Sequence, residues 1–267
     1  MAKNVKQLKV EVRDIKQVKE DLFLLCFVSP HIAKTANPGN FVHIKIDSVI
    51  LRRPLSIHKI VNDEVYILFK VKGRGTSALS NIRKGDYLDI IGPLGQGFNL
   101  PKYEIYNKMH NILIAGGIGV APILFLAQKL NELGKGRLNI KNSILLGAGN
   151  KTDILYEDYF NKIGYKVEVA TDDGSKGVKG FVTDILKNIL AGIELEEVIN
   201  IYACGPEGMF FEMNRVLKDY PKVYCQVSFE QFMGCGLGIC CGCSVETKDG
   251  YKKVCKDGPV FNIKDVW

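Results

Sequence analysis

The sequence contains neither a long unbroken apolar segment nor a basic run interleaved with aromatic residues. Its longest uncharged run, Asn111 to Ala127, is interrupted by glycines and a proline and is shorter than the ~20 apolar residues that a membrane-spanning helix needs. The lysines are scattered, so the net charge of +7 predicts a solvated surface, with no nucleic-acid or membrane partner. Internal repeats and low-complexity segments are also absent.

The amino-terminal segment, Met1 to Glu20, is charged and lacks the apolar core of a secretory signal. We therefore expect a reducing, cytoplasmic compartment. In such a compartment the eight cysteines are expected to be thiols or metal ligands and not disulfides. Cys26 lies in an apolar strand pattern and Cys225 begins the tail, and both are interpreted as small buried side chains.

The length predicts more than one domain, because 267 residues exceed what one small core requires. The residue pattern also changes twice along the chain, near positions 101 and 226. We therefore predict a β-rich domain over 1–100, an α/β domain over 101–225 and a small cysteine-rich module over 226–267.

Short apolar runs separated by turn residues such as Pro38-Gly39 fill the first of these regions. No long helical pattern lies between the runs, which predicts an antiparallel β-barrel or sandwich. The predicted strands cover residues 8–15, 22–28, 40–46, 64–71 and 86–92.

Strand and helix patterns alternate from His110 to Tyr224. This alternation predicts a Rossmann-like parallel sheet with helices on its faces and ligands at the carboxyl ends of its strands. The predicted strands cover 111–115, 142–149, 166–171 and 198–205, and the predicted helices cover 120–133, 154–163, 182–190 and 208–217.

The strongest motif is a C-x4-C-x2-C series followed by a fourth cysteine, inside a glycine-rich stretch near the carboxyl end. This spacing is that of plant-type ferredoxins, in which four thiolates hold a [2Fe-2S] cluster. The glycines permit a tight backbone path that brings amide N–H groups close to the sulfurs. The predicted ligands are Cys235, Cys240, Cys243 and Cys255.

A structural zinc site of four cysteines is the alternative for this stretch. Zinc sites usually arrange their cysteines as two short pairs, whereas here three cysteines share one glycine loop and the fourth stands apart. Cys241 adjoins Cys240, but taking Cys241 as the ligand would change the spacing, so Cys240 is preferred.

A glycine motif, Gly116-Gly117-Ile118-Gly119, follows a predicted strand and opens a predicted helix. Glycines at such a turn let the backbone approach a pyrophosphate, which the helix amino terminus also attracts. The alternative is that the glycines only allow the strand and helix to pack closely.

Two further strand ends carry candidate nucleotide-binding residues. Cys204 ends the last predicted strand beside Gly205 and Pro206, and either lies near a nicotinamide ring or is a buried structural thiol. Asp172 and Asp173 end another strand, where they either bind ribose hydroxyls or form an exposed turn.

An arginine pair, Arg52-Arg53, precedes Pro54-Leu55-Ser56 in the predicted barrel. An arginine fork suits a pyrophosphate, and a nearby serine hydroxyl can hydrogen-bond a flavin edge. Loop amides near Gly75 and Thr76 can hold further phosphate oxygens. The alternative is a surface turn.

Together these motifs resemble the ferredoxin-reductase superfamily, in which an FAD-binding barrel precedes an NAD(P)-binding α/β domain. The RPLS stretch from Arg53 resembles the R-x-[YF]-S flavin motif of that superfamily, and GGIGVAP and CGPEGM resemble its nucleotide motifs. Leu55 departs from the superfamily pattern, which often has an aromatic residue there. Stacking on the flavin ring would then come from elsewhere, such as Phe98 or Tyr66.

A narrower resemblance spans essentially the whole chain. The RRPLSI, KGRGT, IGPLGQGF, AGGIGVAP, CGPEGM and CKDGPVF stretches and the four-cysteine tail are similar, in order and spacing, to the electron-transfer subunits of dihydroorotate dehydrogenase B. The resemblance implies a [2Fe-2S] cluster on the four named cysteines and NAD(H) as co-substrate. It implies FAD near Arg53, Pro54, Leu55, Ser56, Leu68, Phe69, Lys70, Gly75 and Thr76.

The same resemblance implies a partner. It would be an FMN-containing dihydroorotate dehydrogenase catalytic subunit of pyrimidine biosynthesis, in a heterotetramer with two copies of each subunit. Subunits of NADH-dependent ferredoxin:NADP reductases and of sulfide dehydrogenases are similar too, but tend to have aspartate at the first cluster position, so Cys235 favours the dihydroorotate family. A zinc-stabilised nucleotide-binding sensor is the alternative of another class.

Overall fold

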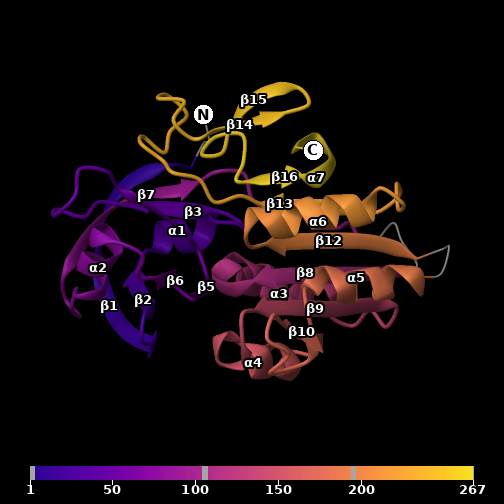
Figure 1. Cartoon of the computed structure of the whole chain (residues 1–267). Coiled ribbons are helices and arrows are strands. Elements are labelled where there is room, and N and C mark those ends of the chain that lie inside the picture. The colour runs from indigo at the N-terminus through magenta and orange to yellow at the C-terminus, as the bar shows by residue number, and fades with distance from the viewer. Residues whose placement is uncertain (1–3, 104–107, 194–196, 267) are drawn as a thin grey trace. The chain divides into compact units, whose positions relative to one another are not determined.

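The computed structural model describes residues 4–103, 108–193 and 197–266. Contacts group the chain into two compact units, Met1–Gly97 with Glu230–Val260, and Phe98–Phe229 with Phe261–Trp267 (Figure 1). The cysteine segment thus belongs to the same unit as the amino-terminal strands. The division into three domains at 101 and 226 stays a prediction.

A seven-stranded antiparallel sheet forms the first unit, in the order β4-β3-β7-β1-β2-β6-β5. β4 also contacts β6, far from it in this order, so the sheet curves back toward closure. Buried and exposed residues alternate along its strands, and this antiparallel half-barrel confirms the predicted antiparallel barrel. Its strands are β1 (Lys6–Lys19), β2 (Leu22–Val28), β3 (Phe41–Ile44), β4 (Arg53–Ser56), β5 (Lys59–Val61), β6 (Glu64–Lys70) and β7 (Tyr87–Leu94).

Two short helices join these strands. α1 (Pro30–Thr35) begins where the Ser29 hydroxyl accepts the N–H of Ile32 at 3.3 Å, with a proline at its first position. α2 (Arg74–Ser80) begins after Gly73. Neither helix was predicted, because each is too short to show a hydrophobic period.

The cysteine segment packs on the loop that follows β7. The N–H of Gln96 donates to the carbonyl of Gly258 at 2.6 Å. A Cβ on Gly95 would lie 2.5 Å from Cδ of Pro259, so only glycine allows this approach. The segment itself contains the hairpin of β14 (Ser244–Thr247) and β15 (Gly250–Lys253).

The second unit contains a sheet in the order β11-β10-β9-β8-β12-β13-β16, whose strands β8 to β13 run parallel. The order reverses between β8 and β12, which is where doubly wound sheets bind ligands. The strands are β8 (Met109–Gly116), β9 (Ile140–Ala148), β10 (Lys166–Thr171), β11 (Val178–Lys179), β12 (Val198–Cys204), β13 (Tyr224–Ser228) and β16 (Val260–Asn262).

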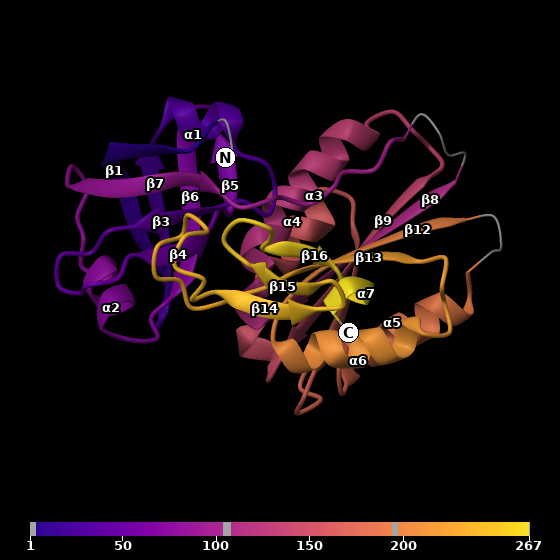
Figure 2. The same cartoon turned by 90° about the horizontal axis from the view of Figure 1, so that it is seen from above.

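Helices cover both faces of this sheet, with α3 on one face and α5 and α6 on the other (Figure 2). The helices are α3 (Val120–Gly134), α4 (Glu157–Lys162), α5 (Val182–Ala191), α6 (Glu207–Leu217) and α7 (Ile263–Val266), with short 3-10 turns at Gly117–Gly119 and Lys151–Asp153. The four strands and the four helices predicted between residues 110 and 224 are all confirmed, although α4 is shorter than predicted. In the part of the chain that the structure describes, every helix is too short or too polar to cross a membrane.

A ladder of asparagines crosses the middle of the sheet. Asn200, Asn111 and Asn142 are register partners on β12, β8 and β9. The Asn200 amide donates to Oδ1 of Asn111 at 3.2 Å, and the Asn111 amide donates to Oδ1 of Asn142 at 2.9 Å. The Asn111 amide also donates to the hydroxyl of Tyr103 at 3.0 Å. These buried amides therefore satisfy one another.

Candidate functional site

The four predicted cluster ligands come together as two pairs of thiols. The N–H of Cys240 donates to Sγ of Cys235 at 3.5 Å, and the N–H of Cys255 donates to Sγ of Cys243 at 3.4 Å. The loop that connects them turns through Gly236 and Gly238, whose φ angles are +70° and +78°. Positive φ favours glycine, so the sequence of the loop fits its backbone path.

Backbone amides point at these sulfurs. Sγ of Cys235 accepts the N–H groups of Leu237 at 3.3 Å and Ile239 at 3.4 Å. Sγ of Cys255 accepts the N–H of Gly238 at 3.1 Å. Burial opposes ionisation of Cys235, but hydrogen bonds from the backbone outweigh it and lower its pKa to about 6. The first cysteine is thus prepared to be a thiolate, the form that binds metal.

The thiols are arranged as a two-iron group would need them. Two thiol pairs match two irons with two protein sulfurs each. Amide donors to the sulfurs are what such a cluster needs around it.

Cys241 lies outside this arrangement. It is exposed, and its Sγ lies 3.8 Å from the carbonyl oxygen of Ile239. Its φ of +57° turns the chain between Cys240 and Gly242. The ligand set itself stays a prediction, and the geometry supports the choice of Cys240. Cys26 and Cys225 are buried, as predicted.

Arg53 and Gly75, both predicted to bind a flavin phosphate, lie in contact. A Cβ on Gly75 would be 2.4 Å from Nε of Arg53, so the guanidinium lies flat on the glycine backbone. Nη1 of Arg53 donates to the carbonyl of Leu51 at 2.7 Å. Within the described residues no carboxylate pairs with Arg53, which leaves its charge available to an anion.

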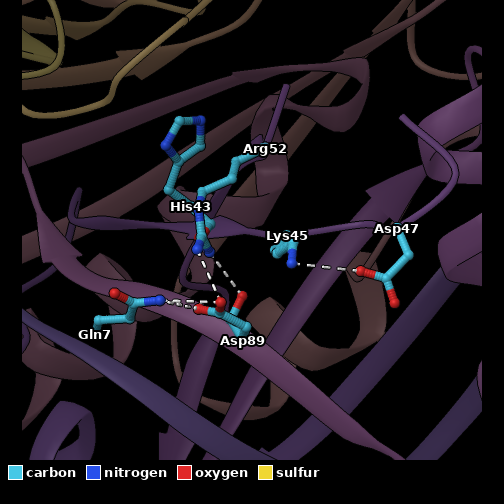
Figure 3. Close-up of polar contacts among 6 residues, drawn as sticks. All are labelled: Gln7, His43, Lys45, Asp47, Arg52 and Asp89. Atoms are coloured by element: carbon cyan, nitrogen blue, oxygen red, sulfur yellow. Dashed lines mark hydrogen bonds and ion pairs between the residues drawn. The ribbon is translucent and has the colours of Figure 1, made fainter. Parts of the chain in front are cut away.

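Arg52, by contrast, is committed to the barrel. Its guanidinium donates to the carboxylate and the carbonyl of Asp89, at 2.9 Å each, and Gln7 donates to the same carboxylate (Figure 3). The hydrogen bond from Arg52 lowers the pKa of Asp89 below its usual value. The two neighbouring arginines therefore have different roles.

Other residues that were predicted to lie near the flavin are committed to the barrel and its loops. Leu68 and Phe69 are buried in the barrel, where Phe69 stacks on Phe23 at 5.8 Å. Residues 68–70 lie beyond the part of β6 that pairs with β5, so one edge of their backbone has no strand partner in the described ladders. The Thr76 hydroxyl accepts the N–H of Lys72 at 2.9 Å and so closes its own loop.

Neither aromatic side chain proposed to replace the stacking residue at Leu55 is free. Phe98 is buried edge-on against Tyr202 at 5.7 Å, in the second unit. The hydroxyl of Tyr66 donates to Glu64 at 2.7 Å, and the ammonium of Lys59 lies 4.3 Å from its ring centre.

The two nucleotide motifs of the α/β unit meet at the switch point. A Cβ on Gly116 would lie 2.7 Å from Cδ of Pro206, and one on Gly119 would lie 2.1 Å from the carbonyl oxygen of Cys204. Gly117 differs, because its φ is +54° and nothing lies within 4 Å of its Cβ position. The packing explanation thus holds for Gly116 and Gly119, and the pyrophosphate explanation suits Gly117.

Asp172 and Asp173 follow β10, two strands from β8 and therefore about 10 Å away across the sheet. The N–H groups of Asp172 and Asp173 donate to the carbonyls of Ala148 and Gly149 at 3.1 and 3.3 Å. Hydrogen bonds from Ser175 lower the pKa of Asp173. Cys204 is only 2% exposed at the end of β12. Roles for these three residues in NAD binding stay predictions.

A cavity of about 670 Å³ lies at the opposite, amino edge of this sheet. Its charged side chains pair with one another. Lys141 forms an ion pair with Glu197 at 3.1 Å, and Lys166 forms one with Glu168 at 2.8 Å. The carboxyl edge therefore remains the better nucleotide site.

Sequence reasoning missed His43, which lies in β3 among apolar residues. The imidazole is fully buried and lies against Gly236, where a Cβ would be 2.5 Å from Nδ1. A single histidine in an apolar strand pattern gives no signal of this contact, because the loop that it meets is far away in sequence.

Comparison with known proteins agrees with this geometry. Residues 230–267 match the iron–sulfur cluster binding domain of dihydroorotate dehydrogenase B, and residues 113–214 match an oxidoreductase NAD-binding domain. A dihydroorotate dehydrogenase B (NAD(+)) electron transfer subunit from Fusobacterium nucleatum is 37% identical, over 96% of each chain. One from Bacillus cereus is 36% identical, over 94% of this chain and 95% of that one.

The chain belongs to the family of dihydroorotate dehydrogenase B electron transfer subunits. A solved NADH-dependent reduced ferredoxin-NADP oxidoreductase also resembles this family member, with a TM-score of 0.82 and 30% identity over 97% of this chain and 89% of that chain. This fold is therefore shared with an NADH-dependent ferredoxin-NADP oxidoreductase.

Proposed function

We propose that the chain is the electron-transfer subunit of an NAD-dependent dihydroorotate dehydrogenase. It would relay electrons from an FMN-containing catalytic partner to NAD+, with FAD near Arg53 and a [2Fe-2S] cluster on Cys235, Cys240, Cys243 and Cys255. The name of the relatives implies a catalytic partner subunit. The assembly proposed is a heterotetramer with two copies of each subunit.

One observation carries this proposal: two thiol pairs, with backbone amides on their sulfurs, belong to the same compact unit as the Arg53 guanidinium, which no carboxylate of the described residues neutralises. A flavin site and a cluster site on one unit fit an electron relay. Bound there, a flavin exchanges a hydride with NAD(H) and single electrons with its neighbour, and an iron–sulfur cluster carries single electrons.

The protein residues would position these groups. Arg53 would pair with the flavin pyrophosphate, and the amides of residues 237–239 would stabilise the negative sulfurs. Gly117 would let the NAD pyrophosphate approach the sheet, with the carboxylates of Asp172 and Asp173 at the ribose. In the proposed reaction dihydroorotate would lose two electrons and two protons in the partner, NAD+ would take up both electrons and one proton as a hydride, and the second proton would be released to solvent.

The absorption spectrum of anaerobically purified full chain, before and after NADH addition, tests this function. We expect flavin bands on a broad iron–sulfur envelope, both bleached by NADH. Zinc without acid-labile sulfide, in a colourless protein, would instead support a nucleotide-binding sensor and contradict the relay.

A subunit of an NADH-dependent ferredoxin:NADP reductase is the second candidate, favoured by the similar solved structure. Co-purification from the native host distinguishes the two candidates by the partner that is retained. The isolated, FMN-free chain should not oxidise dihydroorotate, and finding that activity would refute the division of labour between subunits.

A further inference from the structure

His43 is a fully buried imidazole whose nitrogens are unsatisfied. Its exposure is 0%, and neither Nδ1 nor Nε2 has a hydrogen-bond partner among the described residues. An imidazole carries at least one N–H donor in either protonation state. Native proteins rarely leave buried polar atoms in this state without a reason.

The ring faces the start of the cysteine loop. A Cβ on Gly236 would lie 2.5 Å from Nδ1 and 3.1 Å from Cε1, so the imidazole touches the bare backbone there. The backbone of Cys235 also approaches the ring, without reaching hydrogen-bond geometry. The unsatisfied nitrogens are therefore next to the first predicted ligand.

The backbone of His43 is fixed from the other side. It is paired with Pro54 of β4 and Ile91 of β7, and its carbonyl accepts Nη1 of Arg52 at 3.4 Å. Figure 3 shows the ring pointing away from Asp89, to which the Arg52 guanidinium reaches. The backbone of His43 thus cannot move away from the loop without breaking strand pairing.

We propose that His43 is a positioning residue for the iron–sulfur cluster, whose ring N–H donates to a sulfur on the Cys235 side and raises the reduction potential. Hydrogen bonds to the sulfurs stabilise the more negative, reduced state of such clusters. This would supply the partner that the buried donor lacks. The inference rests on the proposed cluster site.

The test is a redox titration of the full chain, monitored by electron paramagnetic resonance, with iron and sulfide measured in each sample. His43→Leu removes the N–H at similar volume. At a fixed potential it should decrease the ratio of reduced to oxidised cluster by about two- to tenfold, the value of one hydrogen bond. A tenfold change corresponds to a shift of ~59 mV for one electron. His43→Gln keeps an N–H donor and should recover part of the shift.

Thermal unfolding of the cluster-free chain gives a second readout. Replacing an unsatisfied buried ring with an apolar side chain is expected to leave the melting temperature unchanged or raise it. His110→Leu is the matched control, since His110 lies in the other unit and shares a hydrogen bond with the Ser143 hydroxyl at 2.7 Å. This control should leave the potential of the cluster unchanged.

The outcomes separate the inference from the function. Wild-type protein without iron and sulfide would remove the proposed function and the inference with it. A loaded cluster with the same potential in wild type and His43→Leu would overturn the inference alone. Loss of the cluster in both His43→Leu and His43→Gln would show that the ring only packs against Gly236, which also overturns it.

Discussion

A methyl group on Gly119 would lie 2.1 Å from the carbonyl oxygen of Cys204, whereas one on Gly117 would meet nothing within 4 Å. The two glycines of this motif are therefore needed for different structural reasons. Gly119 is required by the packing of β8 and its following helix against the end of β12. Gly117 is favoured by its positive φ angle, and the space at its Cβ position is open to a ligand.

These constraints predict opposite phenotypes. Gly119→Ala should decrease the free energy of unfolding by at least ~1–3 kcal/mol, because the methyl group overpacks a rigid backbone. Gly117→Ala should decrease the free energy of unfolding by only about 1–2 kcal/mol, through backbone strain. It should weaken NADH binding more than Gly119→Ala does. Thermal unfolding and NADH titration of both variants check this. A stable Gly119→Ala variant that has lost NADH binding would reverse the assignment.

Cysteine substitutions should separate the ligands from their neighbour. Cys240→Ser should remove or strongly reduce the iron–sulfur absorbance, because it breaks the Cys235 pair. Cys241→Ser is the matched control and should retain the cluster, since its thiol is exposed and donates to the carbonyl of Ile239. Iron and acid-labile sulfide content measure the result. A cluster that survives Cys240→Ser and is lost in Cys241→Ser would exchange the two roles.

Arg53→Ala should weaken FAD binding by about 10- to 150-fold, the value of a charge-assisted hydrogen bond of ~1.5–3 kcal/mol. Arg53→Lys keeps the charge but not the planar guanidinium that lies on Gly75. Its FAD affinity should lie between those of the wild type and Arg53→Ala. Equilibrium titration of the apoprotein with FAD measures both. Unchanged affinity in Arg53→Ala would rule out the pyrophosphate contact.

Asp89 should stabilise the barrel in a pH-dependent way. The hydrogen bond from Arg52 depresses its folded pKa below the usual 3.8, so its contribution is present above pH 3.8 and is lost as the pH falls through the folded pKa. Because the carboxylate is 34% exposed, we expect only about 0.5–1 kcal/mol. Urea unfolding of Asp89→Asn should show this deficit at pH 7 and little of it near pH 2.

Asp47→Asn is the control for that experiment. Its carboxylate is 96% exposed and lies 3.7 Å from Lys45, so the substitution should matter little at either pH (Figure 3). An equal deficit for Asp89→Asn at both pH values would show that the loss comes from packing and not from the charge.

Much of the fold could be predicted because local patterns determine it. The run from Leu22 to Val28 is a strand in sequence and in structure, and the α/β alternation from residue 110 matched every helix and strand predicted there. The short elements α1, α2 and β5 could not be predicted, since three to seven residues carry too little periodicity.

The sequence predicted which thiols would lie together, but it did not predict their surroundings. Spacing alone picked out four thiols that the structure brings together as pairs. The packing of their loop on β3 and on Gln96 could not be predicted from the sequence. Those contacts join segments more than 130 residues apart and depend on tertiary packing. Likewise, nothing in sequence distinguishes Arg52 from Arg53 until Asp89 is placed beside one of them.

The asparagine ladder has a consequence at a distance from itself. Asn111 and Asn200 are opposite each other near the amino ends of β8 and β12, and the same register continues to Ala115 and Cys204. A slip of one residue would separate the amides in a dry interior, at the cost of two unsatisfied groups. The asparagine pairs near the amino ends of β8 and β12 therefore fix the register at the carboxyl ends of the same strands. Substituting these asparagines would misalign the nucleotide site, although they do not contact it.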